Sequence, residues 1–133
     1  MPNIFGLSPE TCAWNSVDAS LWFARCVRQY EVAGVDVREI AERFLPSLRE
    51  IGTNYRDGTE LGIYCDSEGS IVAGGPKLNA TWMDARTDQG PVTPRDGCAV
   101  EIQALWYALL AHLEHLNTAC GNVRESREWG RSS

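Results

Sequence analysis

Asp18 lies four residues before Trp22 and five before Phe23 in the stretch NSVDASLWF (residues 15–23). A carboxyl group held beside the rings of Trp22 and Phe23 loses part of its hydration and is then suited to general acid catalysis. The alternative is structural: acids are common in the first turn of a helix, where the helix dipole stabilises them, and both rings would lie in the core. The residues alone favour this structural alternative.

The stretch GGPKLNATWMDA (residues 74–85) combines Trp82 with Asp84. Trp82 offers a flat apolar face, and the carboxylate of Asp84 accepts hydrogen bonds from hydroxyl groups. Sugars present both features, because their C–H faces stack on rings while their hydroxyls bond to carboxylates. The glycines let a backbone approach a ligand closely. An equally favoured alternative places Trp82 in the core and Asp84 at a turn.

A third stretch, TPRDGCAVEIQALWY (residues 93–107), makes a tight turn into a helix. Arg95 either pairs with an acid or faces solvent, and solvent is favoured for a lone arginine. Glu101 lies in the first turn of an otherwise apolar helix. It either complements the helix dipole or points inward as a carboxylate that contacts a ligand.

His112 and His115 lie three residues apart, a spacing that two zinc ligands can have. Without a third ligand nearby, surface or core roles are favoured. The five cysteines are scattered and form no CxxC pair, which favours free thiols in a reducing cytoplasm. We expect neither a metal site nor a cofactor.

Three helices must position these residues. The first is expected over residues 16–33, with Asn15 or Ser16 as its N-cap. The second is expected from about residue 36 to residue 55, kinked or split by Pro46. The third covers residues 99–116, and Gly121 marks its end.

The segments between these helices carry turn signals. Apolar runs at 61–64 and 71–73 flank the turn residues 66–69 and predict a β-hairpin. Residues 74–98 are rich in Gly, Pro, Asp and Thr and are expected to form one long loop. The helical domain is therefore expected over residues 1–121, followed by a polar, disordered tail at 122–133.

The third helix is apolar nearly all round, which predicts burial between two helical layers. Its apolar residues are Ile102, Leu105, Trp106, Leu109, Leu110, Leu113 and Leu116. Two other helices supply few partners for such a surface. We therefore expect either self-association into a homo-oligomer or a natural fold larger than this chain.

Composition narrows the class of partner. The 133 residues suffice for one modest domain, and the net charge of −6 argues against binding nucleic acid. No apolar run approaches the roughly 20 residues of a membrane span, and MPNIFGLSPE lacks the features of a signal peptide. A neutral ligand such as an oligosaccharide in the cytoplasm fits this composition.

Five blocks of the chain together resemble a known family. In order they are PNIFG, NSVDASLWF, YRDGTELGIYCDSEGSIVAGG, TWMDA and VTPRDGCAVEIQALWYALL. Their order and spacing are similar to the amylo-α-1,6-glucosidase region of glycogen debranching enzymes over residues 2–116. TWMDA, and Thr-Pro-Arg-x-Gly before Val-Glu-Ile, are the most specific.

The resemblance implies a mainly α fold, part of an (α/α)6 toroid with a small β-hairpin, whose active site lies at one end among loops such as 74–98. It implies hydrolysis of the α-1,6-linked glucose left at a branch stub of glycogen or a related glucan. The reaction is expected to invert the anomeric centre, with an acid and a water-activating carboxylate about 6.5–9.5 Å apart.

By motif position, the resemblance makes Asp18 the general acid, with Trp22 supporting it. Trp82 and Asp84 would bind the glucose ring. Arg95 and Glu101 would line the same site. The general base is expected far downstream of Glu101, and nothing after Leu116 resembles it.

Three hypotheses follow for the chain. It is a debranching glucosidase completed by the remainder of the toroid or by partner chains, a non-catalytic glucan-binding remnant, or a self-associating helical relic without a ligand. The first is favoured for the family, and the other two for the chain alone. A trehalase-type or glucoamylase-type hydrolase is the alternative chemistry. Glucan binding separates the first two hypotheses from the third, and glucose release separates the first from the second.

Overall fold

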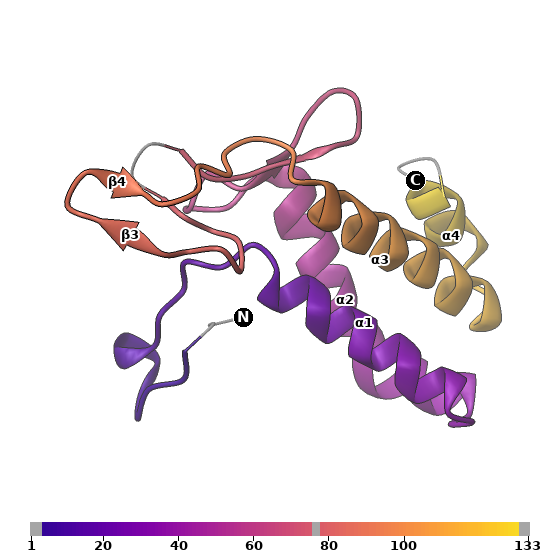
Figure 1. Cartoon of the computed structure of the whole chain (residues 1–133). Coiled ribbons are helices and arrows are strands. Elements are labelled where there is room, and N and C mark those ends of the chain that lie inside the picture. The colour runs from indigo at the N-terminus through magenta and orange to yellow at the C-terminus, as the bar shows by residue number, and fades with distance from the viewer. Residues whose placement is uncertain (1–3, 76–77, 131–133) are drawn as a thin grey trace.

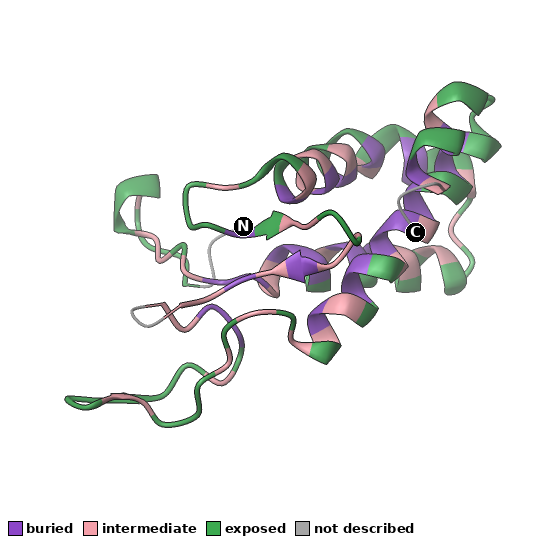
Figure 2. Cartoon of the chain, turned by 90° about the horizontal axis from the view of Figure 1, so that it is seen from above, coloured by how far each residue is buried: buried purple, intermediate pink, exposed green. Residues whose placement is uncertain are grey.

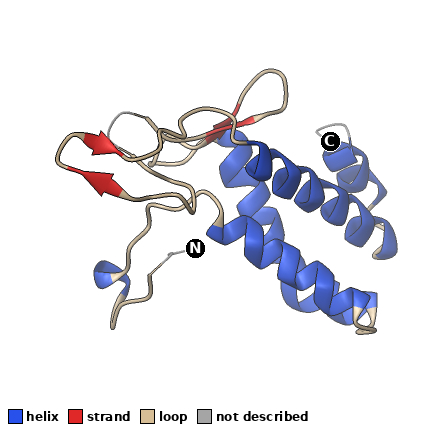
Figure 3. Cartoon of the chain, in the orientation of Figure 1, coloured by secondary structure: helices blue, strands red, loops and turns tan. Residues whose placement is uncertain are grey.

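The computed structural model describes residues 4–75 and 78–130. Within these residues the protein is mainly helical, with short hairpins, as predicted from the sequence. The helices pack together on one side of the molecule, and the strands and long loops gather at one end of them (Figures 1 and 3). The N-terminal segment carries a short 3-10 helix, η1 (Pro9–Thr11), and folds back on itself through a bridge between Ile4 and Ala13.

Helices α1 (Ala19–Val32) and α2 (Val37–Asp57) form a helical hairpin close to the predicted bounds. The N-cap of α1 is Asp18, not the predicted Asn15 or Ser16, although the hydroxyl of Ser16 accepts the Ala19 N–H at 2.9 Å. Pro46 does not split α2, because the helix continues on both sides of it. Each of the two helices has a buried face and an exposed face (Figure 2), and the buried residues belong to the common core.

Helix α3 (Val100–Ala119) packs against α1, α2 and a further helix, α4 (Val123–Gly130). The seven apolar side chains that the sequence places on α3 are all buried. The fourth helix explains why α3 is apolar nearly all round: α4 covers a face that α1 and α2 leave open. The expectation of a disordered tail from residue 122 is therefore wrong over 123–130, and its last residues, 131–133, lie outside the described residues.

Helix α4 is polar in sequence but is anchored by one large side chain. Trp129 is 5% exposed and lies over the backbone of Gly52 in α2. A Cβ atom at position 52 would come within 3.0 Å of the Trp129 ring and 3.1 Å of Leu113. Glycine at position 52 thus lets α2, α3 and α4 meet at a single point.

Polar contacts fix the orientation of α4. Arg49 of α2 donates a hydrogen bond to the fully buried Asn117 of α3 and forms an ion pair with Glu125 of α4. Arg56 pairs with Glu128 at 2.9 Å and lies over the Trp129 ring. Most of these contacts join side chains far apart in sequence, so periodicity could not reveal them.

The predicted hairpin is confirmed as β1 (Tyr64–Cys65) and β2 (Ile71–Val72), paired antiparallel. The carboxylate of Asp66 closes the turn by accepting the N–H groups of Glu68 and Ser70. The amide side chain of Gln103 on α3 then bonds both backbone groups of Ile71 at 2.8 Å each. The Gln103 side chain thus makes the pair of hydrogen bonds that a neighbouring strand would make, and it fastens the hairpin to α3.

The two ends of the long loop after β2 are hydrogen-bonded to each other. Ala73 and Gly97 exchange two backbone hydrogen bonds, of 3.1 and 2.8 Å, and so close the base of the loop. Gly74 is needed here, since a Cβ at φ +89° would lie 3.1 Å from the Asp96 backbone. The loop contains a second hairpin that the sequence did not predict, β3 (Arg86–Thr87) with β4 (Gly90–Pro91).

Candidate functional site

Asp18 lies at the N-cap of α1, and its partly buried carboxylate accepts a hydrogen bond from the Ser16 hydroxyl at 2.5 Å. The carboxylate makes no capping bond, and the Ser16 hydroxyl accepts the first N–H of the helix, that of Ala19, instead. The side chain of Asp18 is therefore held by the Ser16 hydroxyl and is not bonded to the backbone N–H groups of the helix. The sequence predicted Ser16 as an N-cap but not as the partner of Asp18.

Trp22 lies one helical turn after Asp18, and its side chain is 53% exposed. The expectation that both rings of this segment lie in the core is wrong for Trp22. Phe23 is partly buried and meets the ring of Phe44 edge to face, with centroids 6.3 Å apart. Trp22 thus adds an accessible aromatic surface on the same helix as Asp18.

Trp82, Arg95 and Glu101 come together at the base of the long loop. The guanidinium of Arg95 forms an ion pair with Glu101, and its central carbon lies 6.0 Å from the centroid of the Trp82 ring. The favoured expectation that Arg95 faces solvent is therefore wrong, and the pairing alternative is right. Glu101 occupies the first turn of α3 and holds Arg95 beside the indole.

Trp82 is 63% exposed, so the alternative that buries it in the core is wrong. Asp84 is exposed further along the same loop. Thr81, the residue before Trp82, is buried. Among the residues that the structure describes, its hydroxyl oxygen and Nε of Arg95 have no hydrogen-bond partner. Both of these atoms are buried, so the accessible features are the flat ring of Trp82, the cation fixed beside it and the carboxylate of Asp84. They suit a ligand that has both C–H faces and hydroxyls.

A backbone hydrogen bond joins the Asp18 segment to the Trp82 loop. The Val17 N–H donates to the Ala80 carbonyl at 2.7 Å, and both residues are buried. The structure thus places Asp18 and Trp82 each within two residues of one hydrogen bond, although 64 positions in sequence separate them. This contact was not predicted, because backbone pairing between distant segments leaves no residue signature.

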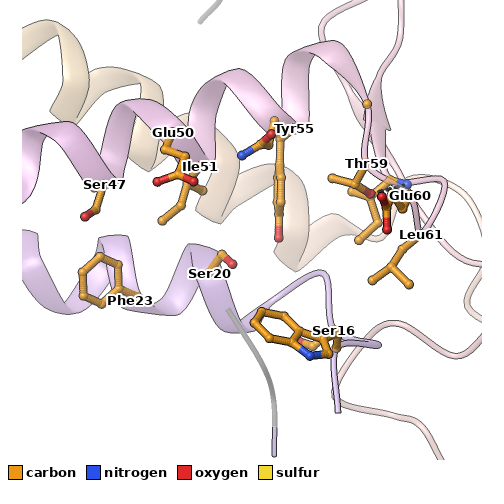
Figure 4. A pocket seen from close by; sticks show the side chains of 14 residues that line it. Ser16, Ser20, Phe23, Ser47, Glu50, Ile51, Tyr55, Thr59, Glu60 and Leu61 are labelled. Carbon is orange, nitrogen blue, oxygen red and sulfur yellow. Dashed lines mark hydrogen bonds between the residues drawn. The ribbon is translucent and has the colours of Figure 1, made fainter. Parts of the chain in front are cut away.

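A groove of about 990 Å³ runs between α1 and α2. Phe23 and Ser20 on α1 face Ile51 and Tyr55 on α2 across it (Figure 4). Ser16 also lines this groove, but none of the six site residues expected from the sequence does. The groove and the Asp18 site are therefore neighbours that share Ser16.

The two histidines of α3 share a single carboxylate on α1. Nε2 of His112 and Nε2 of His115 each lie 2.8 Å from an oxygen of Glu31, which also pairs with Arg28 at 3.1 Å. His112 is buried and His115 is exposed, which agrees with the core and surface roles favoured from the sequence. Among residues 4–75 and 78–130, no cluster of three or more His, Cys, Asp or Glu side chains could hold a metal ion.

This contact predicts loss of stability in acid. Burial lowers the pKa of His112 despite its bond to Glu31. Burial alone would raise the pKa of Glu31, but its hydrogen bonds to the two histidines, together with the charges of His115 and Arg28, lower that pKa. The unfolded chain therefore binds more protons than the folded one, first below about pH 6.5 and then below about pH 4.5. We expect the melting temperature to fall as the pH drops from 7.5 to 5.

His112→Gln should flatten this dependence, because glutamine keeps a donor to Glu31 but does not titrate. His115→Gln, at an exposed position, is the matched control and should retain the slope of the wild type between pH 5 and 7. Thermal melts over that range measure the effect. An unchanged slope in His112→Gln would show that another group causes the acid sensitivity.

Comparisons with known proteins agree with the resemblance noted from the sequence. The model of the family described as amylo-alpha-1,6-glucosidase matches residues 1–131. No curated protein and no solved structure matches the chain. None of the helices formed by the described residues is long and apolar enough to cross a membrane. With nearly its whole length matched, the chain belongs to the amylo-alpha-1,6-glucosidase family.

Proposed function

We propose that the chain binds the α-1,6-linked glucose at a branch stub of glycogen or a related glucan and supplies the general acid for its hydrolysis. The observation that carries this proposal is the hydrogen bond from Val17 to Ala80, at 2.7 Å. It brings the segment of Asp18 against the loop of Trp82 in a chain of the glucosidase family. An acid and a sugar-binding ring must be neighbours if both are to act on one glucose.

The roles follow from the surroundings of each side chain. The exposed face of Trp82 stacks on the C–H face of glucose, and Asp84 accepts hydrogen bonds from its hydroxyls. Arg95, fixed by Glu101, donates hydrogen bonds to the same ring. Asp18 protonates the leaving oxygen while Ser16 holds its carboxyl group, and Trp22 borders the approach.

Inversion also needs a second carboxylate that activates water, about 6.5–9.5 Å from the first. We expect this group to come from the remainder of an (α/α)6 toroid or from a second chain. Glu101 is a poor candidate, because its carboxylate is already engaged in the ion pair with Arg95. This pairing favours, as the alternative, a non-catalytic domain that binds glucan through Trp82 and Arg95.

Two assays on the whole chain separate these functions. Glucose release from a branched limit dextrin reports hydrolysis, and tryptophan fluorescence titrated with maltooligosaccharide or isomaltooligosaccharide reports binding. Release supports the glucosidase, and binding without release supports the alternative. A folded chain that neither releases glucose nor binds glucan would contradict both functions. The helical relic without a ligand would then be the remaining hypothesis.

Trp82→Ala is expected to weaken glucan binding by about 0.5–1.5 kcal/mol, the energy typical of a contact to an aromatic face. This corresponds to a roughly 2- to 12-fold higher Kd. The matched control is Trp14→Ala, which removes another exposed tryptophan from the N-terminal segment. Calorimetric titration measures both variants, and equal losses in the two would argue against a binding role for Trp82.

Self-association and a cytoplasmic location are part of the proposal. Val100 and Tyr107 on α3 and Trp22 on α1 are exposed, which supports contact with a second copy or with the rest of the toroid. All five cysteines are free thiols, which supports a reducing compartment. The net charge of −6 also favours a neutral glucan over nucleic acid. A monomeric mass in light scattering at high concentration would count against self-association.

A further inference from the structure

The hydroxyl of Tyr55 lies where the Asp18 segment meets the Trp82 loop. Tyr55 comes from the last turns of α2, is 5% exposed, and donates its hydroxyl hydrogen to the Val17 carbonyl at 2.7 Å. The Val17 N–H is already bonded to Ala80 at 2.7 Å. Both backbone groups of the residue before Asp18 are therefore held by other parts of the chain.

The bond from Tyr55 acts on the peptide plane that Val17 shares with Asp18. The carbonyl of Val17 and the N–H of Asp18 belong to the same planar group, so holding the carbonyl restricts rotation on both sides of it. Asp18 then takes φ −93° and ψ −29° and leads into α1. With Ser16 bonded to its carboxylate at 2.5 Å, Asp18 is held from the backbone and from the side chain.

Tyr55 is itself fixed and remains a donor. Its ring stacks on Trp106 with centroids 6.2 Å apart, and Trp106 donates to the Gly69 carbonyl at 3.2 Å. Burial, opposed by a hydrogen bond with Ser20 and helped by the charge of Asp18, raises the pKa of Tyr55 to about 12. The hydroxyl is therefore protonated throughout the neutral range.

We propose that Tyr55 is a positioning residue that sets the direction of the Asp18 carboxyl group relative to the Trp82 loop. The inference rests on the general acid role proposed for Asp18. Phenylalanine keeps the ring that packs on Trp106 and removes the oxygen that holds Val17. Tyr55→Phe thus separates positioning from packing.

The first test is amide hydrogen exchange, read by NMR on the whole chain. In Tyr55→Phe the Val17 amide should exchange at least tenfold faster than in the wild type. The buried amides of Leu48 and Leu109 should keep their wild-type rates. Tyr30→Phe, at a 45% exposed tyrosine of α1, is the matched control and should leave Val17 unchanged. Unchanged Val17 exchange, or faster exchange everywhere, would overturn the proposal.

The second test is steady-state hydrolysis of the limit dextrin. Tyr55→Phe should lower kcat at least tenfold and leave KM within about twofold, since the binding groups around Trp82 remain in place. Faster Val17 exchange with an unchanged kcat would overturn the link to catalysis. If the wild type releases no glucose, the general acid proposal fails for this chain, whereas the exchange test still decides whether Tyr55 holds the Asp18 segment.

Discussion

Asp18→Asn is expected to reduce glucose release from a branched limit dextrin by a factor of about 10²–10⁴, the usual contribution of a general acid. The leaving oxygen of a glycoside is a poor leaving group unless it is protonated as the bond breaks. The amide cannot donate that proton as a carboxylic acid does. Initial rates at saturating dextrin measure the loss.

The substitution is mild for the fold. The hydroxyl of Ser16 donates to Oδ1 of Asp18, and the amide oxygen of asparagine can accept the same bond. Asp36→Asn is the matched control, because Asp36 caps α2 by accepting the Arg38 N–H at 2.8 Å, as an asparagine can. The control should keep full activity. Equal rates for Asp18→Asn and the wild type would remove Asp18 from the reaction.

Trp129→Ala is expected to lower the free energy of unfolding by about 3–5 kcal/mol. The ring fills the junction of α2, α3 and α4 over Gly52, and its loss leaves a cavity that the Gly52 backbone cannot fill. It also removes the ring on which Arg56 lies, at 5.1 Å. Such a loss is a large share of the roughly 5–15 kcal/mol of a typical domain.

Urea unfolding followed by circular dichroism measures this change as a lower midpoint. Trp82→Ala serves as the control, since that tryptophan is 63% exposed and should change stability by less than about 0.5 kcal/mol. A midpoint for Trp129→Ala within error of the wild type would mean that α4 does not contribute to the core. Truncation after Gly121 should then be equally harmless.

Periodicity predicted the first three helices because apolar residues recur along each of them at helical spacing. On α1 the buried stripe is Leu21, Ala24 and Val27, at the spacing of a helix. Helix α4 has no such stripe: its buried residues are Ser126 and Trp129, and the rest of its surface is polar or exposed. A helix held by one ring and by ion pairs to other helices looks like a solvated tail in the sequence.

The β3–β4 hairpin was missed for a related reason. Both residues of β3 are exposed, and β4 consists of Gly90 and Pro91, so no alternation of apolar and polar residues marks the strands. The first hairpin was found because Ile63 and Ile71 are buried beside recognisable turn residues. Strands that pair on the surface, without a buried face, have no characteristic pattern of residue types.

The residue types of the site were predicted, and their arrangement was not. Trp82, Arg95 and Glu101 were named from the sequence, and the structure brings them together. The link to Asp18 runs through backbone groups of Val17 and Ala80, which any residue could supply. Arrangement of this kind depends on the tertiary fold, so the sequence carries no local signal for it.

The bridge between Ala73 and Gly97 has a consequence for how this family can diversify. Because two hydrogen bonds clamp the loop at its base, residues at the β3–β4 tip can change in number without disturbing the helices. Doubling the length of a flexible loop costs only about 0.6 kcal/mol. The β3–β4 hairpin begins at Arg86, two residues after Asp84, so longer or shorter versions would reshape the surroundings of Asp84 while the folding core stays the same. Natural variation and laboratory engineering could therefore change this part of the surface at little cost in stability.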